Sequence, residues 1–188
     1  MIRRVLRGCR LLYAAGIACL AVLVACAHGG VAKAPLRTVP TVDLDRYLGT
    51  WYEIASYPQW FQRNCAATTA TYSRREDGRI RVVNACRDGG LDGPSRQVEG
   101  VAWIASEDHS NAKLRVRFFW PFRGDYWIIE LDEDYRYAVV GHPSREYLWI
   151  LARTARIDPA LDADLIRRIE AHGYDAHRLQ RTLQPAER

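Results

Sequence analysis

The sequence predicts an all-β protein: an eight-stranded antiparallel up-and-down barrel with one α-helix packed outside it, after the strands. Two observations lead to this fold class. Eight short runs rich in aromatic and β-branched residues follow one another between residues 50 and 153, with turn signals between them, and a single helical pattern comes after the last run. Antiparallel strands joined in sequence favour a closed barrel, because closure removes the exposed edges of an open sheet.

The composition of the 188 residues fits one domain and argues against a nucleic-acid-binding surface. Hydrophobic residues make up 48% of the chain, enough for a full core. The net charge of +5 is unevenly distributed: residues 1–25 contain four arginines and no acid, so 23 basic and 22 acidic side chains remain in the rest. A nearly neutral domain lacks the positive surface that binds phosphate backbones, and no nucleic acid is expected as a partner.

Residues 1–25 are predicted to be a signal peptide. Arginines cluster before residue 11, and residues 11–24 form an apolar run that is shorter than the roughly 20 residues of a spanning helix. Residues 23–26, Leu-Val-Ala-Cys, resemble the lipobox of bacterial lipoproteins. This resemblance implies cleavage before Cys26 and acylation of that cysteine with chains such as palmitate. A simple secretory signal, with an Ala-x-Ala-like cleavage site at residues 25–27, stays open as the alternative.

Acylation at Cys26 would anchor the protein to a membrane. Several acyl chains anchor stably, because each buried methylene contributes about 0.8 kcal/mol. Alanine, not aspartate, follows the cysteine, which favours the outer membrane, with the domain facing the periplasm. Residues 26–40 hold two glycines and two prolines and are predicted to be a tether. Residues 41–183 then form the domain, and residues 184–188 a short tail.

The eight predicted strands are separated by short turns. Alternation is clearest in the fifth, where Leu114, Val116 and Phe118 share one face and basic residues the other. Asp77-Gly78 marks the hairpin between the second and third strands. The predicted strands span residues 50–56, 66–73, 79–87, 98–106, 113–120, 126–131, 137–140 and 147–153.

One helix follows the strands. Asp158 is expected to cap its N-terminus, Pro159 to occupy its first turn and Gly173 to end it. An apolar stripe, predicted to pack against the barrel wall, recurs every four residues at Leu161, Leu165 and Ile169.

Two cysteines of the domain lie on neighbouring predicted strands. If Ser73 faces Arg79 across the hairpin, Cys65 and Cys86 fall within one residue of direct opposition, close enough for a disulfide. An exported protein meets the oxidising conditions in which such a bond persists. Closing a loop of about 20 residues would stabilise the fold by roughly 3 kcal/mol. Two separate buried thiols are the alternative.

The first and last strands of an up-and-down barrel reach the same end. The first strand begins there with Gly49 and Trp51, and the eighth returns there with Arg153. A guanidinium over an indole face contributes about 0.5 to 2 kcal/mol. Trp51 and Arg153 are therefore predicted to meet and to seal a barrel floor.

Three segments resemble the signature regions of the lipocalin family: Gly49-Thr50-Trp51, residues 131–135, and Arg153. The stretches RYLGTWYEIA and YLWILARTARI resemble the bacterial outer-membrane lipoprotein lipocalins, a group close to apolipoprotein D. The middle region departs from the commonest pattern by carrying two acidic residues before its tyrosine. The resemblance covers about residues 41–183. It implies a calyx that carries a small hydrophobic ligand non-covalently, such as a fatty acid or a lysophospholipid.

Alternation within each strand predicts which side chains face the ligand. Gly100 and Ala102 are expected to leave room inside the barrel. Apolar walls with a few polar groups suit an elongated hydrophobic ligand, although each residue could equally be core. The predicted ligand contacts are Tyr72, Val82, Asn84, Val116, Phe118, Trp120, Tyr126, Ile128, Tyr147 and Trp149.

The open end of the barrel is predicted to carry exposed aromatics. Trp60, Phe61 and Phe122 are expected to flank the mouth and to steer a lipid into it, unless they pack on one another as a lid core. Arg63 and Arg123 are candidates for a phosphate or carboxylate head group. Pairing with a second copy of the chain through this mouth stays open.

Enzyme activity is not expected. The sequence has no Gly-x-Ser-x-Gly elbow, and its five histidines lack metal-ligand spacing, so no metal or cofactor is predicted. Glu53 is expected to be a buried carboxylate paired with an arginine. The alternatives are a haem or tetrapyrrole binder, disfavoured because no histidine lies on the predicted inner face, and a lipid-acting enzyme.

Overall fold

The computed structural model describes residues 34–186, so the predicted signal peptide, Cys26 and most of the predicted tether lie outside the described residues. No helix in the described range has the length and apolar character needed to cross a bilayer. The helices are α1 (Leu44–Tyr47), η1 (Trp60–Gln62), α2 (Pro159–Ala171) and η2 (Ala176–Arg178). The strands are β1 (Gly49–Ser56), β2 (Cys65–Arg74), β3 (Ile80–Asp88), β4 (Ser95–Ile104), β5 (Lys113–Phe119), β6 (Phe122–Leu131), β7 (Tyr137–Gly141), β8 (Leu148–Ala152) and β9 (Gln180–Arg181).

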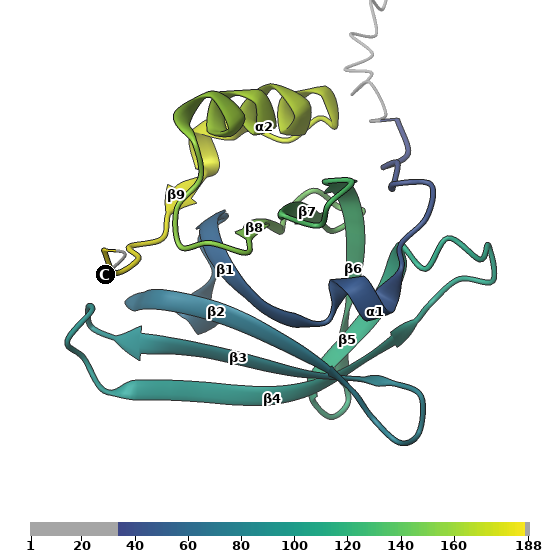
Figure 1. The fold of residues 1–188 in the computed structure, drawn as a ribbon, viewed down its shortest axis with the longest axis horizontal. Coiled ribbons are helices and arrows are strands. Elements are labelled where there is room, and N and C mark those ends of the chain that lie inside the picture. The colour runs from purple at the N-terminus through teal and green to yellow at the C-terminus, as the bar shows by residue number, and fades with distance from the viewer. Residues whose placement is uncertain (1–33, 187–188) are drawn as a thin grey trace, which may run out of the picture. The chain divides into compact units, whose positions relative to one another are not determined.

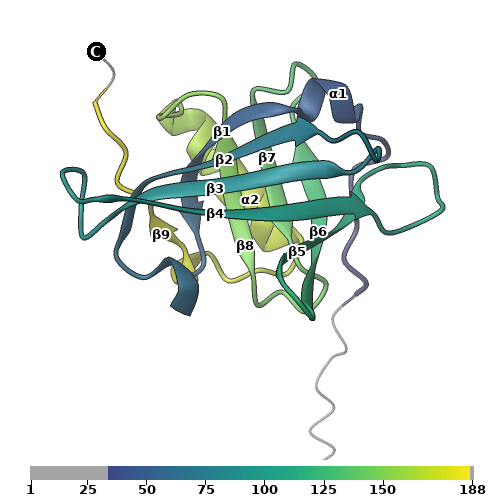
Figure 2. The ribbon, with the colours of Figure 1, turned by 90° about the horizontal axis from the view of Figure 1, so that it is seen from below.

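Strands β1–β8 form the closed antiparallel barrel that the sequence predicts. They are hydrogen-bonded in the order β2-β3-β4-β5-β6-β7-β8-β1, and β1 also pairs with β2. Strands β4 and β6 begin three and four residues earlier than predicted. Figure 2 shows β2, β3 and β4 running side by side, with α1 near one end and the β3–β4 connection at the other.

The seam between β1 and β2 is only partly closed by direct pairing. These strands pair through Gly49–Tyr52, and beyond that point they diverge. The C-terminal segment enters the gap: β9 pairs with the end of β1, and the Ala67 amide donates to the Leu183 carbonyl at 2.7 Å. The side-chain amide of Gln184, in the predicted tail, donates to the backbone carbonyls of Glu53 and Thr68 at 2.8 and 2.9 Å.

Two apolar clusters lie on opposite faces of the barrel wall. The interior cluster lies inside the barrel and includes Trp51, Val82 and Ile128. The outer cluster lies between α2 and the outer faces of β1, β7 and β8, as the position of α2 in Figure 1 shows. Within the predicted stripe of α2, Leu165 and Ile169 are fully buried in the outer cluster.

The register between β2 and β3 differs from the predicted one. Ser73 pairs with Arg81 and not with Arg79, because the turn takes up five residues. A shift of two residues leaves every side chain on its predicted face. The disulfide between Cys65 and Cys86 is present, with a Cα–Cα distance of 5.4 Å. Its pairing is confirmed, although a β-bulge in β2 lies between it and the turn.

Candidate ligand-binding site

The closed end of the barrel is sealed by Trp51 and Arg153. Trp51 has no exposed surface, and its indole N–H donates to the Tyr47 carbonyl at 2.8 Å. The centre of the Arg153 guanidinium lies 3.8 Å from the indole centroid, as the strand order predicts. Gly49 has a φ of +93°, and a Cβ there would lie 3.2 Å from the guanidinium. The guanidinium also donates to the backbone carbonyls of Arg46, Leu48 and Thr50.

Three tyrosines form a polar cluster inside the barrel, just above this floor. The Tyr126 hydroxyl lies 2.8 Å from the hydroxyls of both Tyr47 and Tyr72. Burial raises the pKa of Tyr72 to about 12 and raises the pKa values of the other two well above the ordinary value. The three hydroxyls therefore stay protonated at neutral pH and form a small polar cluster among the apolar side chains of the barrel interior.

Most of the predicted ligand contacts lie inside the barrel. Asn84 on β3 pairs with Ala70 on β2, and Ala70 packs against the interior cluster. The Oδ1 atom of Asn84 is buried without a hydrogen-bond partner among the described residues. Tyr147 precedes β8 and is stacked on Trp149, with ring centroids 6.2 Å apart. Seven others belong to the interior cluster or pack against it: Tyr72, Val82, Val116, Phe118, Tyr126, Ile128 and Trp149.

Two predictions about the inner wall are wrong. Trp120 is 82% exposed, because β5 ends at Phe119 and Trp120 forms the turn to β6. The alternating pattern of β5 therefore does not extend to Trp120. Gly100 is buried but does not leave room for a ligand: a Cβ there would lie 2.6 Å from the Phe118 ring, so Phe118 already takes that space.

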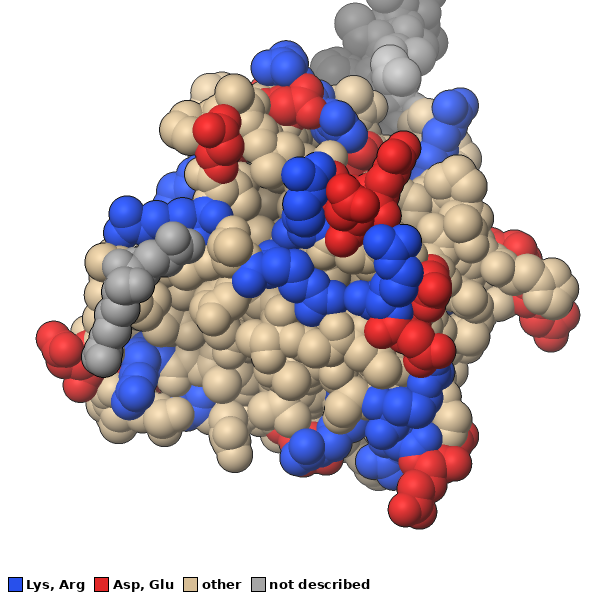
Figure 3. Space-filling view, viewed as in Figure 1, with Lys and Arg blue, Asp and Glu red and all other residues tan. Residues whose placement is uncertain are grey.

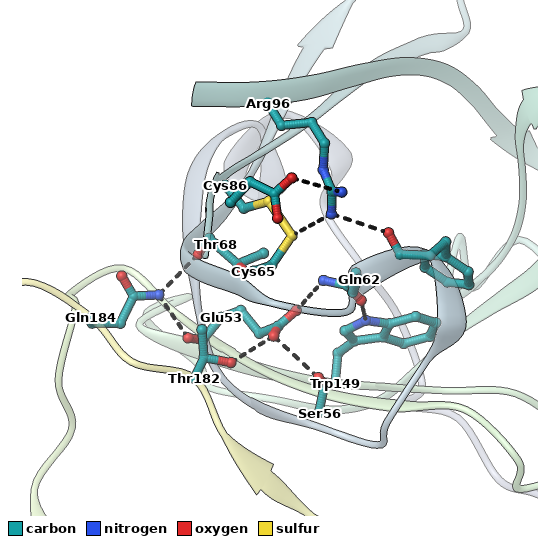
Figure 4. Close-up of a disulfide and its surroundings, with 12 residues drawn as sticks. Glu53, Ser56, Gln62, Cys65, Thr68, Cys86, Arg96, Trp149, Thr182 and Gln184 are labelled. Carbon is teal, nitrogen blue, oxygen red and sulfur yellow. Dashed lines mark hydrogen bonds and ion pairs between the residues drawn. A yellow bond between two sulfur atoms is a disulfide. The ribbon is translucent and has the colours of Figure 1, made fainter. Parts of the chain in front are cut away.

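Glu53 carries a polar network near the open end, and it is not paired with an arginine. Its Oε1 accepts hydrogen bonds from Ser56 (3.1 Å) and Thr182 (2.6 Å), and its Oε2 accepts one from Gln62 (2.9 Å). Figure 4 shows these side chains around the carboxylate, close to the disulfide. The nearby Arg181 is engaged by Asp162 instead. Gln62 in turn accepts from the Trp149 indole at 3.3 Å, which links the network to the barrel interior.

A cavity of about 250 Å³ lies beside this network, under the loop of residues 57–64. Glu53, Gln59 and Arg63 line it together with residues of β9. Gln59 is only 8% exposed, and neither its Oε1 nor its Nε2 has a hydrogen-bond partner among residues 34–186. Gln59, Gln62 and Thr182 are not predicted from the sequence. The one signal in the sequence is Glu53 itself, because a carboxylate that is expected to be buried in the first strand needs polar partners.

The end of the barrel opposite the floor carries the exposed aromatics that the sequence predicts for a mouth, and two more. Trp60 and Phe122 are 76% and 75% exposed, and Phe119 and Trp120 extend the set at the β5–β6 turn. Trp60 contacts Phe61 edge to face, with ring centroids 5.7 Å apart, yet both remain exposed, so they do not form a buried lid core. The two candidate head-group arginines, Arg63 and Arg123, are both exposed on this side of the barrel.

The charged side chains form many local pairs. Acidic and basic side chains are interspersed on the face shown in Figure 3. Examples are Arg81 with Glu99 and Arg136 with Asp132, whose nitrogen–oxygen distances are both 2.7 Å. Among residues 34–186, no group of three or more His, Cys, Asp or Glu side chains is arranged to hold a metal ion.

Comparisons with known proteins agree with this architecture. A lipocalin-like domain model matches residues 42–184. The chain is 38% identical to the outer membrane lipoprotein Blc of Escherichia coli K12, over 94% of this chain and 98% of that protein. It is 39% identical to temperature-induced lipocalin-1 of Arabidopsis thaliana, over 81% and 84% of the two chains. Insecticyanin of the tobacco hornworm Manduca sexta shares the fold, with a TM-score of 0.66 at 20% identity, over 83% of this chain and 87% of that one. The chain therefore belongs to the lipocalin family.

Proposed function

We propose that this protein is a carrier that holds a fatty acid or a lysophospholipid non-covalently in its barrel. The observation that carries the proposal is the contrast between the barrel's two ends. The floor is closed by Trp51 and Arg153, whereas the other end bears exposed aromatic rings. Between them the inward side chains are mainly apolar, with the tyrosine cluster and Asn84 as the polar groups. Such a wall suits a long hydrophobic chain with few polar atoms.

The protein's place is proposed to be the outer membrane, with the domain in the periplasm. Blc of Escherichia coli is named an outer membrane lipoprotein, and the similarity extends over 94% of this chain. The lipobox-like residues before Cys26 support the same anchor. A lipid carrier held at that surface would meet fatty acids and lysophospholipids where membranes release them.

The mouth is proposed to be the entrance for the ligand. Trp60, Phe61 and Phe122 would lie against the membrane surface, where aromatic side chains partition well. Arg63 and Arg123 would attract the anionic part of a lipid head group.

Native mass spectrometry tests the carrier function. Residues 27–188 would be purified without detergent, and any bound lipid extracted and identified. A co-purifying fatty acid or lysophospholipid, displaced by an excess of the same lipid, is the expected result. Val116→Trp would fill the barrel and should abolish lipid retention. Val83→Trp makes the same change on the outer face of β3 and should leave retention intact.

The opposite result has a clear meaning. A protein that is empty, and that also refuses added fatty acids and lysophospholipids, would show that its own side chains fill the barrel. A Soret band on addition of haem would indicate that the ligand is a tetrapyrrole and not a lipid.

A further inference from the structure

We infer that the cavity under the loop of residues 57–64 is a binding site for a zwitterionic amine–phosphate group, with Glu53 and Gln59 as its recognising side chains. The inference rests on the proposed function, because it names the head group of the carried lipid as phosphoethanolamine. The site is separate from the apolar interior of the barrel and from the tyrosine cluster.

The first observation is the carboxylate of Glu53. It is 5% exposed, and it takes part in none of the ion pairs among residues 34–186. Its three donors, from Ser56, Gln62 and Thr182, are all neutral. A carboxylate has about four acceptor positions, so one on Oε2 remains for a donor in the cavity. Because a buried charge is costly unless it is paired, a cationic donor is the group that this position fits.

The second observation is independent of the first. The Gln59 side chain lines the same cavity, and its amide oxygen and nitrogen are both buried without a partner among the described residues. A buried donor and acceptor left unpaired each cost about 1–3 kcal/mol. One ligand that both donates and accepts would satisfy them together. Its ammonium would donate to the Oε1 of Gln59, and its phosphate oxygen would accept from the Nε2 of Gln59.

The rim of the cavity supplies a positive charge. Arg63 lines the cavity, is exposed, and makes no hydrogen bond or ion pair with the described residues. A guanidinium here suits a phosphate, with the ammonium deeper, at Glu53. At about 250 Å³ the cavity is slightly smaller than the roughly 300–1,000 Å³ of pockets that enclose a whole drug-sized ligand. It therefore suits a head group and leaves the acyl chain to another space.

The barrel interior, where the acyl chain is proposed to lie, adjoins the cavity. Gln62 hydrogen-bonds both Glu53 and the Trp149 indole, and Trp149 packs against the interior cluster. Glu53 itself is paired in register with Leu151, a member of that cluster. A lysophospholipid with its amine at Glu53 would therefore have the barrel interior within reach of its acyl chain.

The first test compares two lipids that differ only in the head group. Lipid-free protein would be titrated with lysophosphatidylethanolamine and with lysophosphatidylglycerol of the same acyl chain, by calorimetry. The expected result is tighter binding of the ethanolamine lipid by about tenfold, which corresponds to roughly 1.4 kcal/mol. Glu53→Gln should remove this preference, whereas Glu99→Gln, the same change on the outer face of β4, should keep it. Equal affinities of the wild-type protein for the two lipids would overturn the inference and leave the carrier function standing.

The second test does not depend on lipid binding. Glycerophosphoethanolamine, which has no acyl chain, would be added to ¹⁵N-labelled protein. The side-chain amide signal of Gln59, identified through Gln59→Leu, should shift and saturate, and glycerophosphoglycerol should leave it unchanged. If neither compound moves the signal, the site holds only water and the inference is wrong, whatever the lipids do. If glycerophosphoethanolamine binds but no lipid does, the proposed carrier function is wrong and the head-group site still stands.

Discussion

The two ends of the barrel are built from different interactions. At the closed end, Trp51 is fully buried under the Arg153 guanidinium, and the tyrosine cluster packs directly above it. At the open end, the aromatic rings of Trp60 and Trp120 are exposed, and the polar network of Glu53 joins the strands instead. The disulfide between Cys65 and Cys86 also lies on the open side.

This difference teaches how one small barrel separates stability from binding. Burial of large aromatics is the main stabilising contribution in a core, and the closed end has most of it. Hydrogen bonds to a charged group such as the Glu53 carboxylate contribute about 1.5–3 kcal/mol each, less than the roughly 3–5 kcal/mol of one large buried aromatic side chain, so the open end is held more weakly.

Removal of Trp51 should have the largest effect. Trp51→Ala is expected to lower the free energy of unfolding by about 3–5 kcal/mol, because it leaves a cavity beneath the guanidinium. Trp60→Ala, the same change at the mouth, should shift it by about 0.5 kcal/mol or less. Urea denaturation followed by circular dichroism measures both. Equal losses of unfolding free energy in the two variants would contradict the idea that the closed end supplies most of the stability.

Loss of the disulfide should come next. Replacing Cys65 and Cys86 by serine opens a loop defined by a sequence separation of 21 and is expected to cost roughly 3 kcal/mol. Reduction of the wild-type protein should give the same loss. Hydrogen exchange would show where the loss falls: faster exchange confined to β2, β3 and the open end supports the comparison, and faster exchange at the floor would refute it.

Alkaline pH should act on the closed end. The folded protein holds the pKa of Tyr72 at about 12, above its ordinary value of 10.0, because the ring is buried. For Tyr72 this raised pKa gives stability that is complete below pH 10 and is lost as the pH rises from 10 through 12, by about 2 to 3 kcal/mol. Tyr47 and Tyr126, whose pKa values burial also raises, add further loss over the same pH range. Denaturation at a series of pH values measures the loss. Tyr72→Phe should make this part of the profile less steep without abolishing it, and an unchanged profile in that variant would exclude the residue as a cause.

Exposed aromatics at the mouth should have the smallest effect on stability. The double variant Trp60→Ser, Trp120→Ser is expected to change the free energy of unfolding by no more than about 0.5 kcal/mol. Transfer of a fluorescent fatty acid from vesicles to this variant should be severalfold slower. Ile104→Ser, an exposed apolar residue at the closed end, should leave the transfer rate unchanged. If the double variant accepts lipid at the wild-type rate, the mouth is not the entrance for the ligand.

The closed end was predictable from the sequence, and the open end only in part. Strand order alone brings Trp51 and Arg153 together, because an even number of antiparallel strands returns to the starting end. Trp120 was misplaced because alternation does not mark where a strand stops. The partners of Glu53 were not predictable, since Thr182 lies 129 residues away in sequence and no periodic pattern signals its arrival.

The C-terminal segment in the β1–β2 seam has a consequence for folding kinetics. Contacts between distant parts of a chain form slowly, because loop-closure entropy must be overcome first. The hydrogen bond from Gln184 to the Glu53 carbonyl spans 131 residues, whereas the β2–β3 hairpin with its disulfide is local. The hairpin should therefore form early and the seam close late. Until it closes, half of β1 is an unpaired strand edge, and that interval is when the folding chain is most prone to aggregation.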